Sequence, residues 1–209
     1  MKSFDLSLYL VLDPDLCTQH SMIETAREAV AGGATMVQLR HKHASTRERI
    51  ALGVALMEAL RGTGATVVMN DDVAAAIEAG VDALHIGQGD TSPALARARI
   101  GPDVILGLSI NTEGAAHLVD PAIVDYIGIG PVFATPTKPD HEKPLGFAGL
   151  SQIVAASPVP TVAIGGLKKE HVRRAFSAGA DGVAVVSAIC GTADPRQAAR
   201  ELREQMRKP

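Results

Sequence analysis

The sequence predicts an α/β protein folded as one compact (β/α)8 TIM barrel that spans residues 1–209. Short apolar runs alternate eight times with segments of helical character. These runs are apolar on both faces, which is typical of parallel strands covered on the outside by helices. A weak repeat supports the alternation, because residues 31–37, 78–84 and 177–183 each combine a helix end, a glycine turn and a strand entry. Such barrels typically have ~250 residues, so this one must be compact.

An open, doubly wound parallel sheet is the alternative fold. Its dinucleotide-binding form carries a G-x-G-x-x-G fingerprint directly after the first strand. No such fingerprint follows the first apolar run of this chain. The barrel is therefore the favoured architecture.

The strands are predicted from apolar runs that stop at polar, glycine or proline residues. Asp13-Pro14, for example, ends the first run, and proline removes a backbone donor from the ladder. The predicted strands are 8–12, 35–39, 66–69, 83–86, 104–108, 124–129, 161–164 and 182–185.

The helices are predicted from capping residues and amphipathic spacing. Ser21 and Glu24 form a capping box, and Gly32-Gly33 end the helix that follows. Pro93 suits the first turn of a later helix. Beyond the helix that Ser21 caps, the predicted helices are 46–60, 72–79, 93–99, 113–118, 148–156, 169–178 and 195–206.

Composition excludes several classes of function. The net charge is only −3 and aromatic residues make up 3%, so the basic patches and stacking platforms of nucleic-acid binding are missing. No apolar run suits a signal peptide or a membrane span, so we expect a cytoplasmic protein. Cys17 and Cys190 lack metal-ligand spacing and are expected to be free thiols in a reducing compartment.

A cationic row follows the second predicted strand. Because side chains alternate along a strand, Gln38, Arg40 and Lys42 share one face, which we place at the mouth of the barrel. An amide, a guanidinium and an ammonium in one row favour an anionic ligand. A solvated strand end is the alternative for these cations.

Acidic residues follow the third and fourth predicted strands. Asp72 is placed to cap the next helix. Asp71 and Asp90 come from adjacent strands and could hold one hard cation, and Mg²⁺ fits because it takes one or two carboxylates plus substrate phosphate. A turn or capping role is the alternative for each aspartate. No His/Cys cluster suggests zinc.

A second set of anion-binding groups follows the later strands. Thr135, Thr137 and Lys138 come after the break at Gly130-Pro131. Gly165-Gly166 follow the seventh predicted strand, and Ser187 is expected to open a short helical piece that ends at Cys190. Loops at these positions form the phosphate site of many barrels. Two anion sites without a nucleophile–base pair indicate transfer of a carbon that bears a diphosphate to a phosphorylated acceptor.

Taken together and in order, these motifs resemble the thiamine-phosphate synthase family over nearly the whole chain. The segments that carry the resemblance are 38–42 (QLRHK), 70–71 (ND), 85–90 (HIGQGD), 107–109 (GLS), 130–138 (GPVFATPTK), 163–166 (AIGG) and 185–187 (VVS). The resemblance implies Mg²⁺-dependent transfer of a hydroxymethylpyrimidine group from its diphosphate to the ring nitrogen of hydroxyethylthiazole phosphate. The products would be thiamine phosphate and diphosphate.

The resemblance also implies a role for individual residues. The implied catalytic residues are Arg40, Lys42, Ser109 and Lys138. Pyrimidine diphosphate would bind Gln38, Leu39, Arg40, His41, Lys42, Asn70, Ser109 and Lys138. Thiazole phosphate would bind Thr135, Pro136, Thr137, Gly166, Val186 and Ser187. Asp71 and Asp90 would hold Mg²⁺.

One position departs from the family pattern. Asn111 stands where family members usually carry a histidine, the residue that a related thiazole tautomerase is said to use as its base. This departure favours a synthase. An isomerase acting on a phosphorylated substrate and a non-catalytic binder of thiamine precursors are the competing classes. We expect residues 134–146 to form a lid, and the sequence allows a homo-oligomer.

Overall fold

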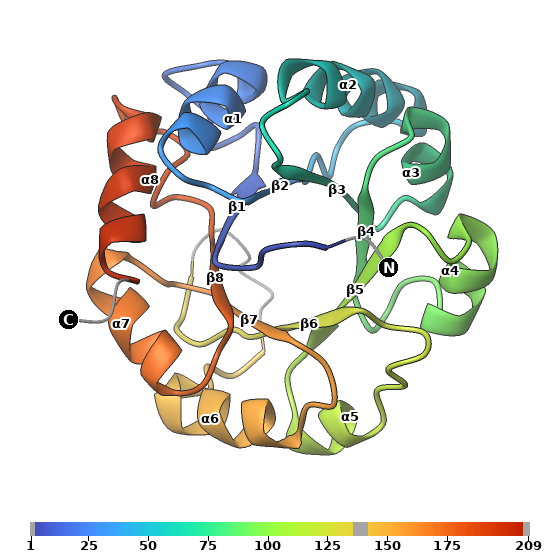
Figure 1. Cartoon of the computed structure of the whole chain (residues 1–209), viewed down its shortest axis with the longest axis vertical. Coiled ribbons are helices and arrows are strands. Elements are labelled where there is room, and N and C mark those ends of the chain that lie inside the picture. Colours follow the sequence, from blue (N-terminus) through green and yellow to red (C-terminus); the bar gives the residue numbers. More distant parts are fainter. Residues whose placement is uncertain (1–2, 136–141, 207–209) are drawn as a thin grey trace.

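The computed structural model describes residues 3–135 and 142–206. Eight parallel strands close into a barrel in chain order (Figure 1). The strands are β1 (Leu8–Leu12), β2 (Met36–Leu39), β3 (Thr66–Asn70), β4 (Ala83–Ile86), β5 (Ile105–Ile110), β6 (Tyr126–Ile129), β7 (Thr161–Ile164) and β8 (Gly182–Val185). The predicted (β/α)8 barrel is confirmed.

A helix follows each strand and lies outside the barrel (Figure 1). The helices are α1 (Met22–Ala31), α2 (Thr46–Ala59), α3 (Val73–Ala79), α4 (Pro93–Ile100), α5 (Glu113–His117), α6 (Gly146–Ala156), α7 (Lys169–Ser177) and α8 (Pro195–Glu204). Ser21 caps α1 by accepting from the Glu24 backbone N–H, as predicted. None of the helices in the described ranges is long and apolar enough to cross a membrane.

Two predicted boundaries were wrong by more than one residue at sites that matter below. Strand β5 extends to Ile110, because Ser109 and Ile110 remain paired with β6. Strand β6 begins only at Tyr126, since the side chain of Asp125 bonds the neighbouring strand. The expected helical piece after β8 is a hydrogen-bonded turn, in which Cys190 N donates to Val186 O.

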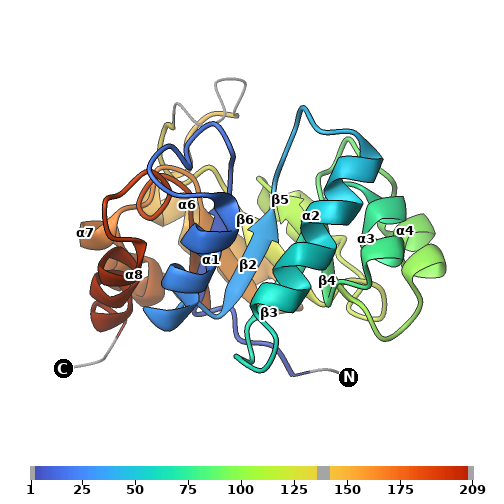
Figure 2. The same ribbon diagram turned by 90° about the horizontal axis from the view of Figure 1, so that it is seen from above.

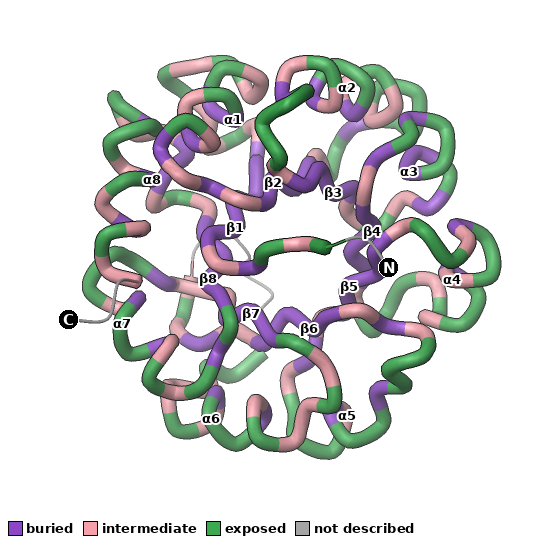
Figure 3. Tube along the Cα trace, in the orientation of Figure 1, coloured by how far each residue is buried: buried purple, intermediate pink, exposed green. Residues whose placement is uncertain are grey.

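The core has two layers separated by the sheet. Figure 3 shows a buried ring of strands inside helices whose outer surfaces are exposed. One layer lies between strands and helices, whereas the other fills the barrel with alternate strand residues such as Tyr9, Met36, Val68 and Tyr126. Because side chains alternate, the inward-facing residues nearer the carboxyl ends of the strands are left to form the site.

Four side chains join neighbouring strands at the end of the barrel where the strands begin, and we call them the strand clamps. Each directly precedes an even-numbered strand and accepts a hydrogen bond from the backbone N–H at the start of the strand before it. The pairs are Thr35 with Leu8 (3.2 Å), Asp82 with Val67 (3.0 Å), Asp125 with Leu106 (2.7 Å) and Asp181 with Thr161 (2.8 Å). Three of the clamps lie within the sequence repeat, which therefore has a structural cause.

The two cysteines, 173 positions apart in number, meet in the fold. Cys17 is half-buried and Cys190 is buried, and both are free thiols, as predicted. A hydrogen bond with the Cys190 thiol lowers the pKa of Cys17. The Cys190 thiol also lies 3.6 Å from the carbonyl oxygen of Val11.

We expect Asp181→Ala to lower the free energy of unfolding by about 1–3 kcal/mol, because the Thr161 N–H loses its acceptor within the sheet. Urea denaturation would measure the change. Asp103→Ala, which removes an exposed aspartate before β5, is the control and should shift stability by no more than about 0.5 kcal/mol. Equal stabilities for the two variants would contradict the clamp.

Candidate active site

A cavity of about 650 Å³ lies at the carboxyl ends of the strands, and it collects most of the predicted site residues. In the side view of Figure 2, this end carries the loops that follow the strands, whereas the chain approaches β1 from the other end. The cavity has two sides, because β2, β3 and β4 lie across the barrel from β6, β7 and β8.

The first side is cationic, and Arg40 and Lys42 line it together with Gln38, as the alternation along β2 predicted. Arg40 is held in place, since its Nη1 donates to Asp13 Oδ2 at 2.7 Å and both side chains are nearly buried. Lys42 is exposed. The cationic row therefore combines one fixed guanidinium with one ammonium free to rotate on its stem.

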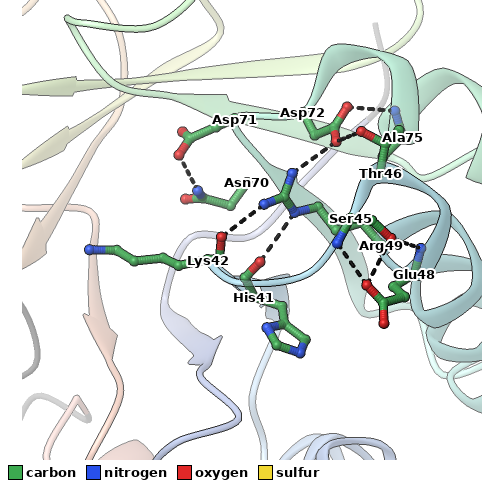
Figure 4. A network of polar contacts seen from close by, with 10 residues as sticks. All are labelled: His41, Lys42, Ser45, Thr46, Glu48, Arg49, Asn70, Asp71, Asp72 and Ala75. Carbon is green, nitrogen blue, oxygen red and sulfur yellow. Dashed lines mark hydrogen bonds and ion pairs between the residues drawn. The ribbon is translucent and has the colours of Figure 1, made fainter.

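Arg49 of α2 positions the loop that carries Lys42, and sequence inspection missed it. Its guanidinium donates to the carbonyl oxygens of His41 (3.2 Å) and Lys42 (3.1 Å), and to Asp72 Oδ2 (3.0 Å). Figure 4 shows these contacts converging on one side chain. Arg49 is thus a positioning residue that fixes the β2–α2 loop against the start of α3.

Asp71 and Asp72 are adjacent in sequence but have different roles. Asp72 turns toward α3, where it accepts from Ala75 N (2.9 Å) and Thr46 Oγ1 (2.8 Å), and so caps the helix as predicted (Figure 4). Asp71 turns the other way and lines the cavity. Its φ of 62° is left-handed, a conformation that aspartate and asparagine tolerate better than most residues.

The two predicted metal ligands face each other. Burial, the charge of Asp90 and a hydrogen bond with Asp90 raise the pKa of Asp71 to about 6, against a smaller opposing effect of Asn70 and Arg40. Asp90 in turn accepts from Gly87 N at 2.8 Å. Two carboxylates that share a proton form a donor set that suits a hard divalent cation. Within residues 3–135 and 142–206, no group of three His, Cys, Asp or Glu could hold a metal by itself.

The floor of the cavity is a polar layer inside the barrel. Ser109 lies in β5 and bonds His85 Nε2 at 3.0 Å, and His85 bonds the Tyr126 hydroxyl. Burial lowers the pKa of His85 to about 4, so this imidazole is neutral at physiological pH. His85 was predicted to be a satisfied core side chain, and the structure confirms it.

The second side is made of small residues and backbone. Thr135, Gly166, Val186 and Ser187 all line the cavity there. Gly166 has φ 63°, and a Cβ at this position would lie 2.7 Å from the carbonyl oxygen of Ala134. Glycine is therefore required for the close approach of the β7 turn to the chain after β6.

Some predicted residues are not brought to the cavity. Leu39 is buried in the outer core layer, and the side chain of His41 does not line the cavity, since alternation points both away from it. Pro136, Thr137 and Lys138, together with the rest of the 136–141 part of the predicted lid, lie outside the described residues. Asn111 does line the cavity and accepts a hydrogen bond from Gln88 at 3.1 Å.

Comparison with known sequences identifies relatives over nearly the full chain. A family model described as thiamine monophosphate synthase matches residues 8–189. The thiamine-phosphate synthase of Psychrobacter sp. (strain PRwf-1) is 49% identical over 207 residues, which cover 96% of each chain. That of Moorella thermoacetica is 45% identical over 199 residues, which cover 94% of each chain.

Comparison with solved structures identifies the same family as the sequence comparison. A thiamine phosphate pyrophosphorylase from Pyrococcus furiosus superposes with a TM-score of 0.86 at 35% identity, covering 96% of this chain and 95% of that one. A 3-hexulose-6-phosphate synthase superposes with a TM-score of 0.71 at 19% identity, covering 96% of this chain and 100% of that one. The second likeness shows the fold alone.

We expect Asp71→Asn and Asp72→Ala to change stability in opposite directions in metal-free buffer. Asp71→Asn removes the cost of burying a charged carboxylate and the repulsion with Asp90, and should therefore stabilise the protein. Asp72→Ala removes a helix cap and should lower the free energy of unfolding by about 0.5–2 kcal/mol. Urea denaturation at several pH values would measure both.

The sign of the pH dependence follows from the raised pKa. Asp71 ionises near pH 4 when unfolded and near pH 6 when folded, so the parent protein loses stability as pH rises through this window. The advantage of Asp71→Asn should therefore be absent below pH 4, grow between pH 4 and pH 6, and stay constant above. A difference independent of pH would show that folding does not raise the pKa of Asp71.

Proposed function

The chain belongs to the thiamine monophosphate synthase family, and we propose that it transfers a hydroxymethylpyrimidine group from its diphosphate to the ring nitrogen of hydroxyethylthiazole phosphate. One observation carries this proposal. A single cavity is lined on one side by cations and a carboxylate pair, and on the other by threonine, serine and glycine. Two phosphorylated substrates can therefore bind face to face.

The pyrimidine diphosphate is placed on the β2 side. Arg40 is already oriented by Asp13, so little side-chain freedom is lost when it bonds a phosphate oxygen. Lys42 adds a second positive charge from a flexible stem. Lys138, outside the described residues, keeps its predicted role as a third cation. These charges stabilise the diphosphate as the bond to the pyrimidine methylene carbon breaks.

The donor set of Asp71 and Asp90 fits Mg²⁺, with the remaining ligands supplied by water and diphosphate oxygens. A bound Mg²⁺ would neutralise charge on the departing diphosphate. It would also offset the charge of Asp90, which together with burial raises the pKa of Asp71. In the metal-free protein, the Asp71–Asp90 pair holds a proton in the place of a cation at low pH.

The thiazole phosphate is placed on the opposite side, where Thr135 and Ser187 offer hydroxyls and the Gly166 turn offers backbone N–H groups. The phosphate anchors the thiazole so that its ring nitrogen faces the pyrimidine methylene carbon. Diphosphate leaves first, and the amino group of the pyrimidine stabilises the resulting cation. The nitrogen then forms the new bond with its own electron pair, so no protein base is needed, and the position of Asn111 accords with this.

The direct test is incubation of the purified protein with both half-substrates and Mg²⁺. We expect thiamine phosphate and diphosphate in equal amounts, and no product when either half-substrate is omitted or EDTA is added. Asp90→Asn should require a higher Mg²⁺ concentration for half-maximal rate. Consumption of the thiazole phosphate alone would instead indicate an isomerase, and binding of both substrates without turnover would indicate a non-catalytic binder.

Lys42→Ala and Arg40→Ala should separate binding from stability. Lys42→Ala removes an exposed cation, so we expect a raised KM for the pyrimidine diphosphate with an unchanged free energy of unfolding. Arg40→Ala leaves Asp13 as an uncompensated, nearly buried charge, and should also lower the free energy of unfolding by about 3 kcal/mol. Adding Asp13→Asn should restore stability but not KM. Full kinetic rescue by that second change would exclude a substrate contact for Arg40.

A further inference from the structure

Five side chains form one continuous hydrogen-bonded chain beneath the cavity. Gln38 Nε2 donates to the Tyr9 hydroxyl at 2.7 Å, and the Tyr9 and Tyr126 hydroxyls lie 3.0 Å apart. Tyr126 lies 3.0 Å from His85 Nδ1, and His85 Nε2 lies 3.0 Å from Ser109 Oγ. We call Tyr9, Tyr126 and His85 the relay. Gln38 and Ser109, the two residues that the relay joins, line the cavity, as do parts of Tyr9 and His85.

The barrel interior is shaped to hold the relay. Tyr9 and Tyr126 are fully buried, and His85 is 9% exposed. Gly107 in β5 makes room for them, because a Cβ there would lie 2.4 Å from the Tyr126 hydroxyl and 2.5 Å from His85 Nδ1. A Cβ at Gly128 would lie 3.2 Å from the His85 ring. Two strands thus carry glycine where any side chain would press on these contacts.

The chain has a direction. A hydroxyl that links two partners accepts from one and donates to the other, and a neutral imidazole has one donor and one acceptor nitrogen. With Gln38 donating to Tyr9, every hydroxyl of the chain has both an acceptor and a donor partner when Tyr9 donates to Tyr126 and Tyr126 donates to His85 Nδ1. His85 Nε2–H then donates to Ser109, whose own O–H is left to point into the cavity. Since Gln38 uses Nε2 to bond Tyr9, its amide oxygen is left for a ligand. The chain therefore presents an acceptor to the cavity at Gln38 and a donor at Ser109.

We propose that the relay sets this polarity and thereby selects an aminopyrimidine over an oxopyrimidine, an inference that rests on the proposed function. An aminopyrimidine offers an N–H donor at its exocyclic group and an acceptor at a ring nitrogen, which matches Gln38 and Ser109. The 4-oxo analogue offers an acceptor at the exocyclic group and carries its proton on a ring nitrogen. Matching it at both ends, with every polar group of the chain still paired, requires reversal of the bonds from Gln38 to Ser109.

Selection matters for the proposed chemistry. Only an exocyclic amino group can release enough electron density to stabilise the cation formed when diphosphate leaves. An amino group that donates its hydrogen to the Gln38 oxygen becomes a better electron donor. The polar atoms of Tyr9, Tyr126 and His85 are all engaged within the chain, so these three are positioning residues that act through Gln38 and Ser109.

The test uses Tyr126→Phe, which breaks the relay and keeps the ring, and Tyr9→Phe, which breaks it one step earlier. Ile105→Val is the control, because it alters the same interior layer and removes no hydrogen-bonding group of the relay. For each protein, kcat/KM is measured with the 4-amino and the 4-oxo pyrimidine diphosphates, together with equilibrium binding of each compound. The quantity compared between proteins is kcat/KM for the amino compound divided by kcat/KM for the oxo compound.

We expect the parent to prefer the amino compound by on the order of 100-fold or more, since a mismatched buried polar pair is strongly rejected. Either tyrosine variant should reduce the ratio at least tenfold, and the double variant should reduce it no further because one break suffices. Ile105→Val should leave the ratio within twofold of the parent. If both tyrosine variants keep the parent's ratio, the relay does not set specificity, whereas failure of the parent to form thiamine phosphate would overturn the proposed function instead.

A spectroscopic measurement tests the direction itself. ¹⁵N chemical shifts of the His85 ring distinguish which nitrogen carries the proton. We expect the Nε2–H form in the parent and a mixture of forms in Tyr126→Phe, where the Nδ1 acceptor has lost its donor. Finding the Nδ1–H form in a parent protein that prefers the amino compound would overturn the proposed polarity.

Discussion

Closure of a parallel barrel forces alternate side chains of every strand into one small interior, and the rest of the molecule depends on this constraint. The lower interior positions are filled by large apolar residues such as Met36 and Val68. Higher along the strands, the same alternation delivers Gln38, Asn70, His85 and Ser109 to the floor of the cavity. A single geometric rule therefore creates both the core and the site, and no insertion or second domain is needed to build either.

The site contains two pairs of charged side chains that have opposite effects on stability. Arg40 is neutralised by Asp13 from the β1 end, whereas Asp71 faces a carboxylate of the same sign. The first pair stabilises the metal-free protein, and the second destabilises it. Burial and the charge of Asp90 therefore both oppose ionisation of Asp71. Arg49 bonds Asp72 and the carbonyl oxygen of Lys42, and so links the loops on either side of this pair.

Local signals sufficed for much of this molecule. Apolar runs, capping residues and glycine turns indicated eight strand–helix units. Alternation separated Arg40 from His41, and the position before a helix separated Asp72 from Asp71. Contacts between distant segments were out of reach of such signals. Asp13 and Arg40 are 27 residues apart, and His85 and Tyr126 are 41 apart. Their pairing is fixed by the strand register, which the sequence does not display. For the same reason, the meeting of Cys17 with Cys190 was not predicted.

The strand clamps have a consequence for how such a molecule can change over time. All four lie at the end of the barrel where the strands begin, so the frame is fastened without help from the segments around the cavity. Substitutions, insertions or deletions in those segments can alter which molecules are bound while the frame stays assembled. Changes in ligand specificity and maintenance of the fold therefore depend on opposite ends of the barrel.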